Sequence, residues 1–324
     1  VEEAFKKALR SLDTDVYLHT NPNEIRMILS RPTDERFPTL FDAFKAGFPL
    51  SEIQDLTDIA PFFLEKIKNI VDLERRLCES PAPDDILLAR TYGFTEPELA
   101  ALTGIAECEI RDLAGDPTYK MVDTCAAEFP ATTPYFYSTR DEACEIPRSD
   151  RNKVLILGSG PIRIGQGIEF DYCTVHAVKA LRDEHVEVHI VNNNPETVST
   201  DFDTSDRLFF EPMALEDIMN ILEKDHYSGV MVQFGGQNAV NLAVPIHQEL
   251  QKRGMSTRIL GTSPDSMDIA EDRDRFSELL RELDIPSPPN SSAYSLEEAR
   301  IKAAAIGYPV LVRPSYVLGG RAME

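Results

Sequence analysis

A short apolar run that leads into a glycine-rich loop constrains the fold of this chain more than any other feature. Residues 154–157 read Val-Leu-Ile-Leu, four glycines follow between residues 158 and 167, and an amphipathic segment occupies residues 170–184. So short an apolar run, bounded by glycine, is typical of a buried strand. The sequence therefore predicts a strand, a tight turn and the start of a helix. Free backbone N–H groups at such a junction bind anions such as phosphate or carboxylate.

A dinucleotide-binding site is the first hypothesis to test against this spacing. The nicotinamide fingerprint has a third glycine in G-x-G-x-x-G and an acidic residue at the end of the second strand. Here Arg163 holds the third glycine position, and the second predicted strand runs into three asparagines that begin at Asn192. Both differences argue against NAD. The alternative to any ligand is that the glycines only permit a close turn.

Apolar runs alternate with amphipathic segments from residue 150 onward. The pattern predicts strands at 154–157, 186–191, 230–234 and 258–260, and helices at 170–184, 215–224 and 238–252. Such alternation is typical of a parallel sheet covered by helices on both faces. Polar loops follow the strands at 192–201, 234–237 and 261–264. We expect a ligand crevice where these loops meet, with ordinary turn chemistry as the alternative.

The first 115 residues predict a helical region. Helical periodicity occurs at residues 4–12, 25–29, 40–44, 62–77 and 86–89, and capping boxes are predicted to begin at Ser51 and Thr95. A weak repeat places Gly47 and Phe48 in the same pattern as Gly93 and Phe94, 46 residues later. A DNA-reading helix needs Arg, Lys, Asn or Gln toward the bases, and the second unit offers glutamates instead. The region is interpreted as a packing or association module.

The segment between residues 116 and 149 has no helical period and is predicted to be extended. Cys125 invites a nucleophile hypothesis, but no histidine lies near it in the sequence, and a small buried thiol is the commoner role. The five cysteines form no C-x-x-C pair. We expect reduced, mostly buried thiols in a cytoplasmic protein.

The charge balance limits the partners that the chain can bind. The 324 residues, enough for about two domains, carry 55 Asp and Glu against 33 Lys and Arg, a formal charge of −22. So acidic a surface repels nucleic-acid backbones and anionic lipid, and no apolar run is long enough to span a bilayer. An anionic ligand therefore has to be held by local arginines and backbone amides.

The C-terminal part offers a second candidate anion site. A helix is predicted to begin within residues 270–276, and another is capped from Ser295. Residues 309–312 predict a strand that ends at Arg313, and Gly319 and Gly320 form a turn whose amides are suited to phosphate. A surface ion pair is the alternative role for Arg313.

Several of these segments together resemble the large subunit of carbamoyl-phosphate synthase. They read DTCAAEF at 123–129, GSGPIRIGQGIEFDYC at 158–173, NPETVSTD at 194–201, GGQ at 235–237, EDR at 271–273 and VRPSYVLGGRAME at 312–324. The resemblance implies an all-α oligomerisation domain at 1–149, a Rossmann-like parallel α/β pre-ATP-grasp domain at 150–264, and the beginning of an ATP-grasp domain at 265–324. The ending Gly-Gly-Arg-Ala-Met is similar to the half of that subunit which phosphorylates carbamate.

The resemblance also implies roles for individual residues. Arg273 and Arg313 would contact ATP phosphates, with Arg313 in the catalytic role, and Gly319 and Gly320 would belong to the lid over them. Glu169 and Glu196 match carboxylates that line the family's interior carbamate tunnel. Transfer of a phosphoryl group from ATP to carbamate needs Mg²⁺, whose ligands are expected beyond Glu324.

The implied protein is a ligase of pyrimidine and arginine biosynthesis. Its expected partners are the rest of the large subunit, a glutaminase small subunit, and a second copy bound through residues 1–149. We expect this polypeptide alone to be inactive. Two alternatives are a scaffold that only associates and walls the tunnel, and another ATP-grasp ligase such as biotin carboxylase, which has no place for the 123–129 segment.

Overall fold

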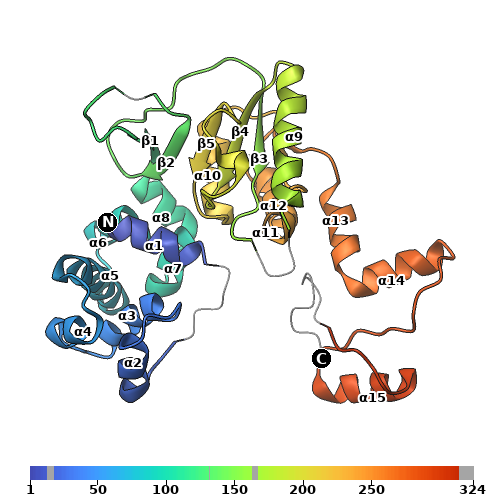
Figure 1. Ribbon diagram of the computed structural model, residues 1–324, viewed down its shortest axis with the longest axis horizontal. Coiled ribbons are helices and arrows are strands. Elements are labelled where there is room, and N and C mark those ends of the chain that lie inside the picture. The colour runs from blue at the N-terminus through green and yellow to red at the C-terminus, as the bar shows by residue number, and fades with distance from the viewer. Residues whose placement is uncertain (13–17, 131, 163–166, 314–324) are drawn as a thin grey trace. The chain divides into compact units, whose positions relative to one another are not determined.

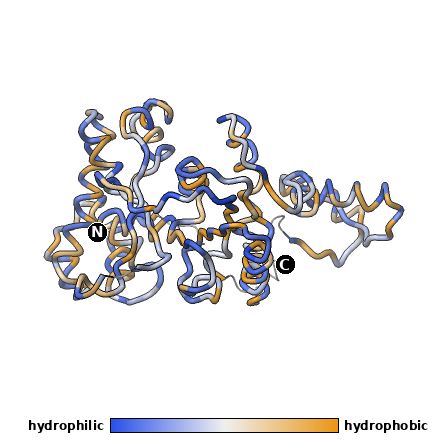
Figure 2. Tube along the Cα trace, turned by 90° about the horizontal axis from the view of Figure 1, so that it is seen from above, coloured by the Kyte–Doolittle hydropathy of each residue, from blue (hydrophilic) through white to orange (hydrophobic). Residues whose placement is uncertain are grey.

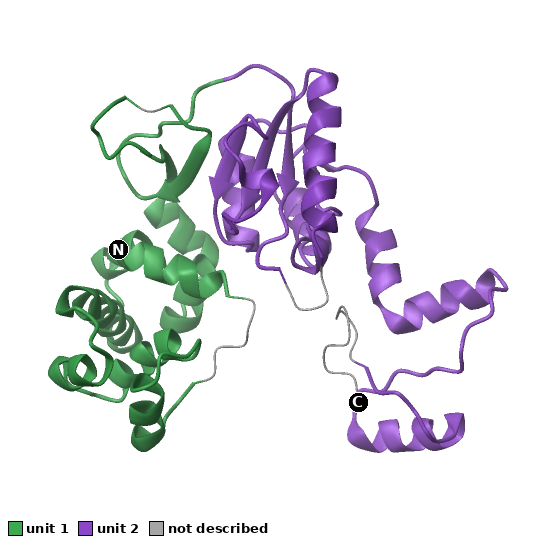
Figure 3. Cartoon of the chain, in the orientation of Figure 1, with its two compact units in different colours: residues 1–148 green, residues 149–324 purple. Residues whose placement is uncertain are grey.

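The computed structural model describes residues 1–12, 18–130, 132–162 and 167–313. The chain divides into two compact units, Val1–Arg148 and Ser149–Glu324 (Figure 3). Each unit has its own core, and we describe each by itself.

Unit 1 is a helical bundle followed by a hairpin (Figure 1). Its helices are α1 (Glu2–Arg10), α2 (Pro22–Leu29), α3 (Arg36–Lys45), α4 (Leu50–Thr57), α5 (Pro61–Glu79), α6 (Pro83–Thr91), α7 (Glu96–Thr103) and α8 (Glu107–Ala114). α5 is the central element, because its apolar side chains recur at helical spacing and are buried, among them Leu64, Ile67 and Leu77. The predicted helical region is confirmed.

The weak sequence repeat is a structural repeat. Gly47 and Gly93 both have a φ of +85°, a left-handed conformation that favours glycine. The next residue, Phe48 or Phe94, is buried and donates its N–H to the carbonyl five residues earlier, at 3.0 Å in both copies. The helix pair α3–α4 therefore has the same connection as the pair α6–α7.

The second helix of each repeat also ends in the same way. The hydroxyl groups of Thr57 and Thr103 donate to the carbonyl four residues earlier, at 2.7 Å in both copies. The following residue is left-handed in both copies, but it is Asp58 (φ +56°) in the first and Gly104 (φ +73°) in the second. The first copy thus carries a side chain where the second has none.

This difference predicts a stabilising substitution. Asp58→Gly should raise the free energy of unfolding by about 0.5–1 kcal/mol, because glycine adopts the left-handed C-cap without the steric cost of a Cβ atom. Urea unfolding of the chain, followed by circular dichroism, measures the change. Gly104→Ala is the matched variant and should shift stability in the opposite direction; a destabilising Asp58→Gly would contradict the prediction.

Two local predictions in unit 1 have different outcomes. The capping box at Thr95 is confirmed, because its side chain accepts the N–H of Glu98 and the Glu98 carboxylate accepts the N–H of Thr95. The box at Ser51 is wrong: α4 begins one residue earlier, after Pro49, which places Ser51 inside the helix. Pro49 holds an extended backbone conformation and ends the preceding turn, so the helix starts directly after it.

The segment predicted to be extended forms an antiparallel hairpin of β1 (Thr118–Met121) and β2 (Tyr135–Thr139). Lys7 of α1 donates to the backbone carbonyl of Ser138 at 2.7 Å, which fastens this hairpin to the helices of unit 1. The expectation of mostly buried thiols is wrong. Cys78, Cys108 and Cys144 are exposed, and all five cysteines are free.

Unit 2 contains a parallel sheet (Figure 1). Its strands are β3 (Lys153–Leu157), β4 (Glu187–Asn192), β5 (Arg207–Phe210), β6 (Gly229–Met231) and β7 (Arg258–Ile259), in the spatial order β5-β4-β3-β6-β7. Neighbouring pairs are parallel. This is the order of a Rossmann-like sheet, with the topological switch point between β3 and β6.

Two strands differ from the prediction: β5 was not predicted, and β6 is shorter than the predicted 230–234. β5 begins with Arg207, a charged residue that hides the strand pattern, yet its side chain is buried because it pairs with Glu187 on β4. Hydrophobic periodicity carries no information on such a cross-strand charge pair. β6 ends at Met231 because the chain turns toward α11 immediately afterwards.

The helices of unit 2 are α9 (Glu169–Asp183), η1 (Val198–Thr200), α10 (Leu215–Lys224), α11 (Gly236–Val240), α12 (Ala243–Lys252), α13 (Pro264–Glu271), α14 (Arg273–Glu282) and α15 (Leu296–Ile306). The predicted helix at 238–252 is two helices, and the helix expected within 270–276 starts at Arg273 after a cap from Asp272. The cap at Ser295 is confirmed. Hydrophobic residues (orange) and hydrophilic residues (blue) are interspersed along the helices (Figure 2).

The segment after α13 differs from the rest of unit 2 because neither α14 nor α15 buries a residue. The predicted strand at 309–312 is absent; Leu311 and Val312 are 69% and 60% exposed and make no ladder with any described strand. A strand needs a hydrogen-bonding neighbour, and sequence pattern alone does not supply one. Within the described ranges, no helix is both long and apolar enough to cross a bilayer.

Candidate functional site

The carboxyl edge of the sheet in unit 2 brings together the loops that follow β3, β4 and β6. Asn192, at the end of β4, is fully buried, and its Oδ1 atom accepts the N–H of Gly160 at 3.0 Å. A Cβ atom on Gly158 would lie 2.6 Å from the Asn192 side chain, so only glycine permits this approach. The glycine-rich loop is thereby fixed against β4.

Two further asparagines hold the same loop. Asn194 donates through Nδ2 to the carbonyl of Gly160 at 3.2 Å. Asn238, on α11, donates through Nδ2 to the carbonyls of Ser159 and Pro161 at 3.0 and 3.4 Å. The loops meet as expected, but these side chains bind backbone groups of the loop. From the sequence, Asn192 and Asn194 are expected in loops around a ligand crevice and Asn238 in a helix, and this role in holding the glycine-rich loop was not predicted.

These contacts bear on the hypothesis of a dinucleotide site. In a nicotinamide-binding loop, backbone N–H groups near the second glycine face the pyrophosphate. The N–H of Gly160 instead donates to Asn192. This contact supports the exclusion of NAD that the sequence spacing indicated.

Glu169 and Glu196 lie on two adjacent segments of this edge. Glu169 is the first residue of α9, is exposed, and accepts the N–H of Gly167 at 3.1 Å. Glu196 is exposed in the loop after β4, and its N–H donates to Asn194 Oδ1 at 3.0 Å. α9 packs against η1, which directly follows the Glu196 loop. The structure therefore places Glu169 at the start of α9 and Glu196 in the loop two residues before η1, which packs against α9.

Arg273 and Arg275 are close in sequence but differ in their surroundings. Arg275 forms ion pairs with Asp265 at 2.6 Å and with Asp268, and its hydrogen bonds to these carboxylates raise the pKa of the guanidinium. Arg273 is exposed in the first turn of α14 and forms no ion pair with another described residue. Arg273 is therefore the arginine with a guanidinium open to a ligand.

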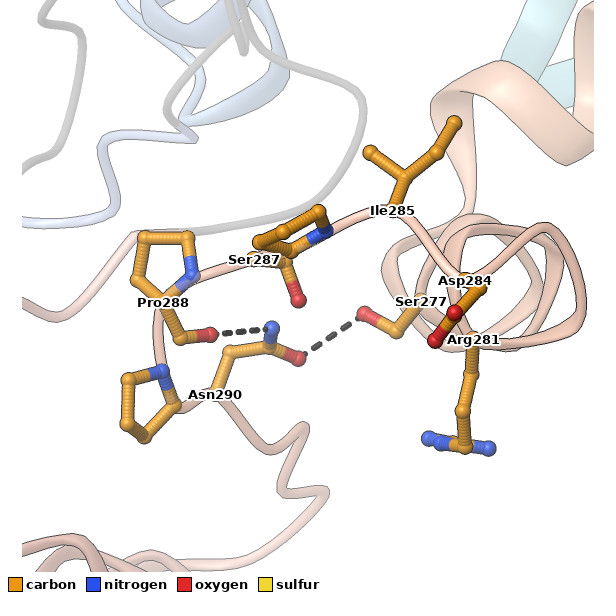
Figure 4. Close-up of a pocket in the computed structure, with 9 residues that line it drawn as sticks. Ser277, Arg281, Asp284, Ile285, Ser287, Pro288 and Asn290 are labelled. Atoms are coloured by element: carbon orange, nitrogen blue, oxygen red, sulfur yellow. Dashed lines mark hydrogen bonds between the residues drawn. The ribbon is translucent and has the colours of Figure 1, made fainter.

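The remaining predicted phosphate ligands lie at the end of the described chain. Arg313 is exposed and lies outside any helix or strand. Gly319 and Gly320 lie outside the described residues. A hollow of about 370 Å³ lies between α14 and residues 284–290 (Figure 4). It contains none of the predicted site residues, and Asn290 bridges it by accepting from Ser277 and donating to the carbonyl of Pro288.

A buried group of titratable side chains lies near the start of the same strands. Glu187 on β4 accepts a hydrogen bond from Ser149, and its Oε1 atom is 2.9 Å from His189 Nε2. The other ring nitrogen, Nδ1, is 2.7 Å from the hydroxyl of Tyr227. A carboxylate only accepts, so Nε2 carries the proton and the neutral ring accepts from Tyr227.

Burial and these hydrogen bonds set the protonation states. The hydrogen bond from His189 is the main cause that lowers the pKa of Glu187, to about 2. Burial disfavours the charged imidazole and lowers the pKa of His189. Burial also raises the pKa of Tyr227 well above its ordinary value, which keeps the phenol a donor. This buried charge group was not identified from the sequence, because its members are distant along the chain.

The same pKa shifts predict acid-sensitive stability. Below the ordinary histidine pKa of 6.5, an unfolded chain binds a proton at His189 that the folded chain does not. Between 4.5 and about 2, the same holds for Glu187. The free energy of unfolding should therefore fall as the pH falls below about 6.5. Urea midpoints across this range measure the effect; His189→Gln should reduce the slope near the histidine pKa, and an unchanged slope would contradict the prediction.

Among the described residues, no group of three or more His, Cys, Asp or Glu side chains is placed to hold a metal ion. We therefore assign Mg²⁺ ligation to no described residue of this chain.

The strand order, together with a glycine-rich loop held by asparagine side chains, defines a Rossmann-like α/β domain joined to a helical domain. Known protein families match the chain in consecutive segments. Residues 1–117 match the oligomerisation domain of the carbamoyl-phosphate synthetase large chain, 150–269 the carbamoyl phosphate synthase preATP-grasp domain, and 272–324 the ATP-binding domain of the carbamoyl-phosphate synthase L chain.

Individual relatives agree with these matches. The carbamoyl phosphate synthase large chain of Methanoregula boonei is 75% identical over 324 residues, and that of Methanoculleus marisnigri is 73% identical over 325, covering 100% of this chain in each case. The chain belongs to the carbamoyl phosphate synthase large-chain family. It spans 31% of the length of these relatives.

Solved structures give only a distant similarity. Pyruvate carboxylase of Rhizobium etli is 14% identical with a TM-score of 0.36, and covers 54% of this chain and 15% of its own. The N5-carboxyaminoimidazole ribonucleotide synthetase of Thermus thermophilus is 18% identical with a TM-score of 0.35, and covers 49% of this chain and 37% of its own. Neither carries an argument about this chain.

Proposed function

We propose that this chain forms part of a carbamoyl phosphate synthase large chain and acts in the ATP-dependent phosphorylation of carbamate. The observation that carries the proposal is the 75% identity to a large chain along the full 324 residues. The three matched domains also follow one another in the order that the sequence resemblance implies. The reaction class is that of a ligase in pyrimidine and arginine biosynthesis.

We assign the phosphate contacts of ATP to Arg273 and Arg313. The exposed guanidinium of Arg273 and its position at a helix N-terminus, where anions are favoured, support the first. The exposed position of Arg313 supports the second, because a planar guanidinium binds phosphate in a bidentate manner. When bound, ATP supplies the phosphoryl group, and these arginines orient it. Gly319 and Gly320 are assigned to the lid over the phosphates.

We assign Glu169 and Glu196 to the wall of a carbamate passage at the carboxyl edge of the sheet. Their exposure and the packing of α9 against η1, next to Glu196 in the chain, support this role, since both carboxylates face solvent where a ligand can reach them. The amino group of carbamate is a hydrogen-bond donor that a carboxylate accepts. Carbamate decomposes in water, so a passage that excludes water preserves it.

The domain assignment follows the same family. Residues 1–149 form the oligomerisation domain and carry contacts to a second copy, 150–264 form the pre-ATP-grasp domain, and 265–324 begin the ATP-grasp domain. The glutaminase small subunit is the proposed nitrogen-donor partner, and the cytoplasm the proposed compartment. The sequence families favour this function over biotin carboxylase.

The proposal is tested with a complete large chain whose corresponding segment is this sequence. Supplied with MgATP, bicarbonate and ammonia, it should form carbamoyl phosphate. Arg313→Ala should lower kcat by about 100-fold, the loss typical when one charge-stabilising group is removed. Arg300→Ala, on exposed α15, removes the same charge and should change kcat less than about twofold. No carbamoyl phosphate from the unsubstituted enzyme would overturn the proposal.

The isolated 324-residue chain should show no carbamoyl phosphate synthesis, because it spans only 31% of the length of the large chains that it matches. Calorimetric titration with MgATP separates two forms of the proposal. Binding that Arg313→Ala abolishes would place the phosphate site within this chain. If neither the unsubstituted chain nor Arg313→Ala binds MgATP, the result would favour the role of scaffold and passage wall.

A further inference from the structure

We propose that Asp171 is a positioning residue that sets the separation of Glu169 and Glu196 at the carboxyl edge of the sheet. This inference rests on the proposed function, in which the two glutamates line a carbamate passage. Asp171 is not assigned contact with carbamate. It acts through the two segments that carry the glutamates.

The bridge formed by Asp171 is direct. Asp171 lies in the first turn of α9 and is 8% exposed. Its Oδ2 atom accepts the N–H of Val198 at 2.9 Å, and its Oδ1 atom accepts the N–H of Ser199 at 3.1 Å. Both amides belong to η1, the turn that follows the Glu196 loop. One buried side chain therefore fastens the start of α9 to this turn.

The position of this bridge along the chain determines which residues it can position. Glu169 precedes Asp171 by two residues, and Glu196 precedes Val198 by two residues. Each glutamate therefore lies only two residues before a residue that takes part in these hydrogen bonds. Both glutamate carboxylates are exposed and neither takes part in the bridge, so the bridge holds the two backbones without occupying the glutamate side chains.

The chemistry of the bridge favours a carboxylate. Two N–H groups of adjacent residues point at one side chain: that of Val198 donates to Oδ2 of Asp171, and that of Ser199 donates to Oδ1 at 3.1 Å and also to Oδ2 at 3.4 Å. Asparagine has one acceptor oxygen and no charge, so the two N–H groups would share one neutral acceptor and one of them would face the NH₂ group. Asp171→Asn therefore loosens the bridge with almost no change in side-chain volume.

The bridge itself can be measured in this chain by amide hydrogen exchange. Asp171→Asn should raise the exchange rates of the Val198 and Ser199 amides by about tenfold or more, the factor for loss of roughly one hydrogen bond. Thr174→Val is the matched control. Thr174 is 1% exposed on the same helix and donates only to the carbonyl of Phe170. Unchanged exchange at Val198 and Ser199 in Asp171→Asn would overturn the proposal.

The effect on function is measured in the complete large chain with MgATP, bicarbonate and ammonia. If Asp171 positions the passage, Asp171→Asn should release carbamate to water, and the ATP consumed per carbamoyl phosphate formed should rise at least about threefold. Bicarbonate-dependent ATP consumption should persist. Thr174→Val should leave this ratio unchanged.

The outcomes separate the two proposals. A parallel fall of ATP consumption and carbamoyl phosphate, with the ratio constant, would indicate a merely structural residue and overturn the positioning role. A ratio that stays constant with both rates intact would also overturn it. If the unsubstituted enzyme forms no carbamoyl phosphate, the proposed function itself is overturned, whatever the result for Asp171→Asn.

Discussion

Glu187→Ala is expected to lower the free energy of unfolding of unit 2 by about 3–5 kcal/mol, the range for removing one member of a buried ion pair. The glutamate is 4% exposed and pairs with Arg207 at 3.3 Å and with His189 at 2.9 Å. Its removal leaves a buried guanidinium without one of its carboxylates and the His189 N–H without its acceptor. Urea unfolding followed by fluorescence or circular dichroism measures the loss.

A second glutamate provides the control for this substitution. Glu249 on α12 also pairs with an arginine, Arg253, at 2.9 Å, but its side chain is 18% exposed, against 5% for Glu187. Glu249→Ala should cost no more than about 1 kcal/mol, the usual range for a surface pair. Equal losses for the two variants would show that the buried charge group contributes nothing beyond an ordinary ion pair.

Gly235→Ala is expected to destabilise unit 2 by about 2–3 kcal/mol, as overpacking does in a closely packed core. The glycine lies just before α11, at the switch point between β3 and β6. An added Cβ atom would lie 2.8 Å from the carbonyl oxygen of Leu157, and it would also contact the carbonyl oxygen of Gly158. These are backbone atoms, which cannot rotate away as a side chain can. Thermal unfolding measures the change.

The control for Gly235 is a glycine in open space. Gly254 has no atom within 4 Å of an added Cβ, although its φ of +63° costs an alanine about 1 kcal/mol. Gly254→Ala should therefore destabilise less than Gly235→Ala. The variant at Gly235 should also change amide exchange in the Gly158–Gly160 loop, because the collision is with that loop. A loss no greater than that of Gly254→Ala would contradict the packing argument.

The part of the fold that follows from local pattern was predictable. The helical first third, the capping box at Thr95, the start of α9 next to Glu169 and the strands β3 and β4 all depend on neighbouring residues. The repeat was also visible, because the same left-handed turn and buried phenylalanine occur twice. The Ser51 capping box failed because Pro49 moved the helix start, a competition between two local signals.

The candidate site was only partly predictable, for a physical reason. Sequence pattern indicated that the loops after the strands would meet, and the family resemblance implied roles for Glu169 and Glu196. It did not indicate that Asp171 joins their segments, since its partners Val198 and Ser199 are 27 and 28 residues away and are backbone amides, which have no sequence signature. The openness of Arg273 likewise depends on Arg275, rather than Arg273, pairing with Asp265 and Asp268.

The sequence by itself determined the helical and α/β classes and the family resemblance, because these depend on periodicity and on short contiguous motifs. Only the tertiary structure decided which polar residues are buried partners. Arg207 can lie in a buried strand because it pairs with Glu187 on the neighbouring strand. Asn192 can hold the glycine-rich loop because Gly158 has no Cβ atom to collide with its side chain. Burial of a charge or an amide costs free energy unless a partner offsets it, and that partner is chosen by the packing of distant segments.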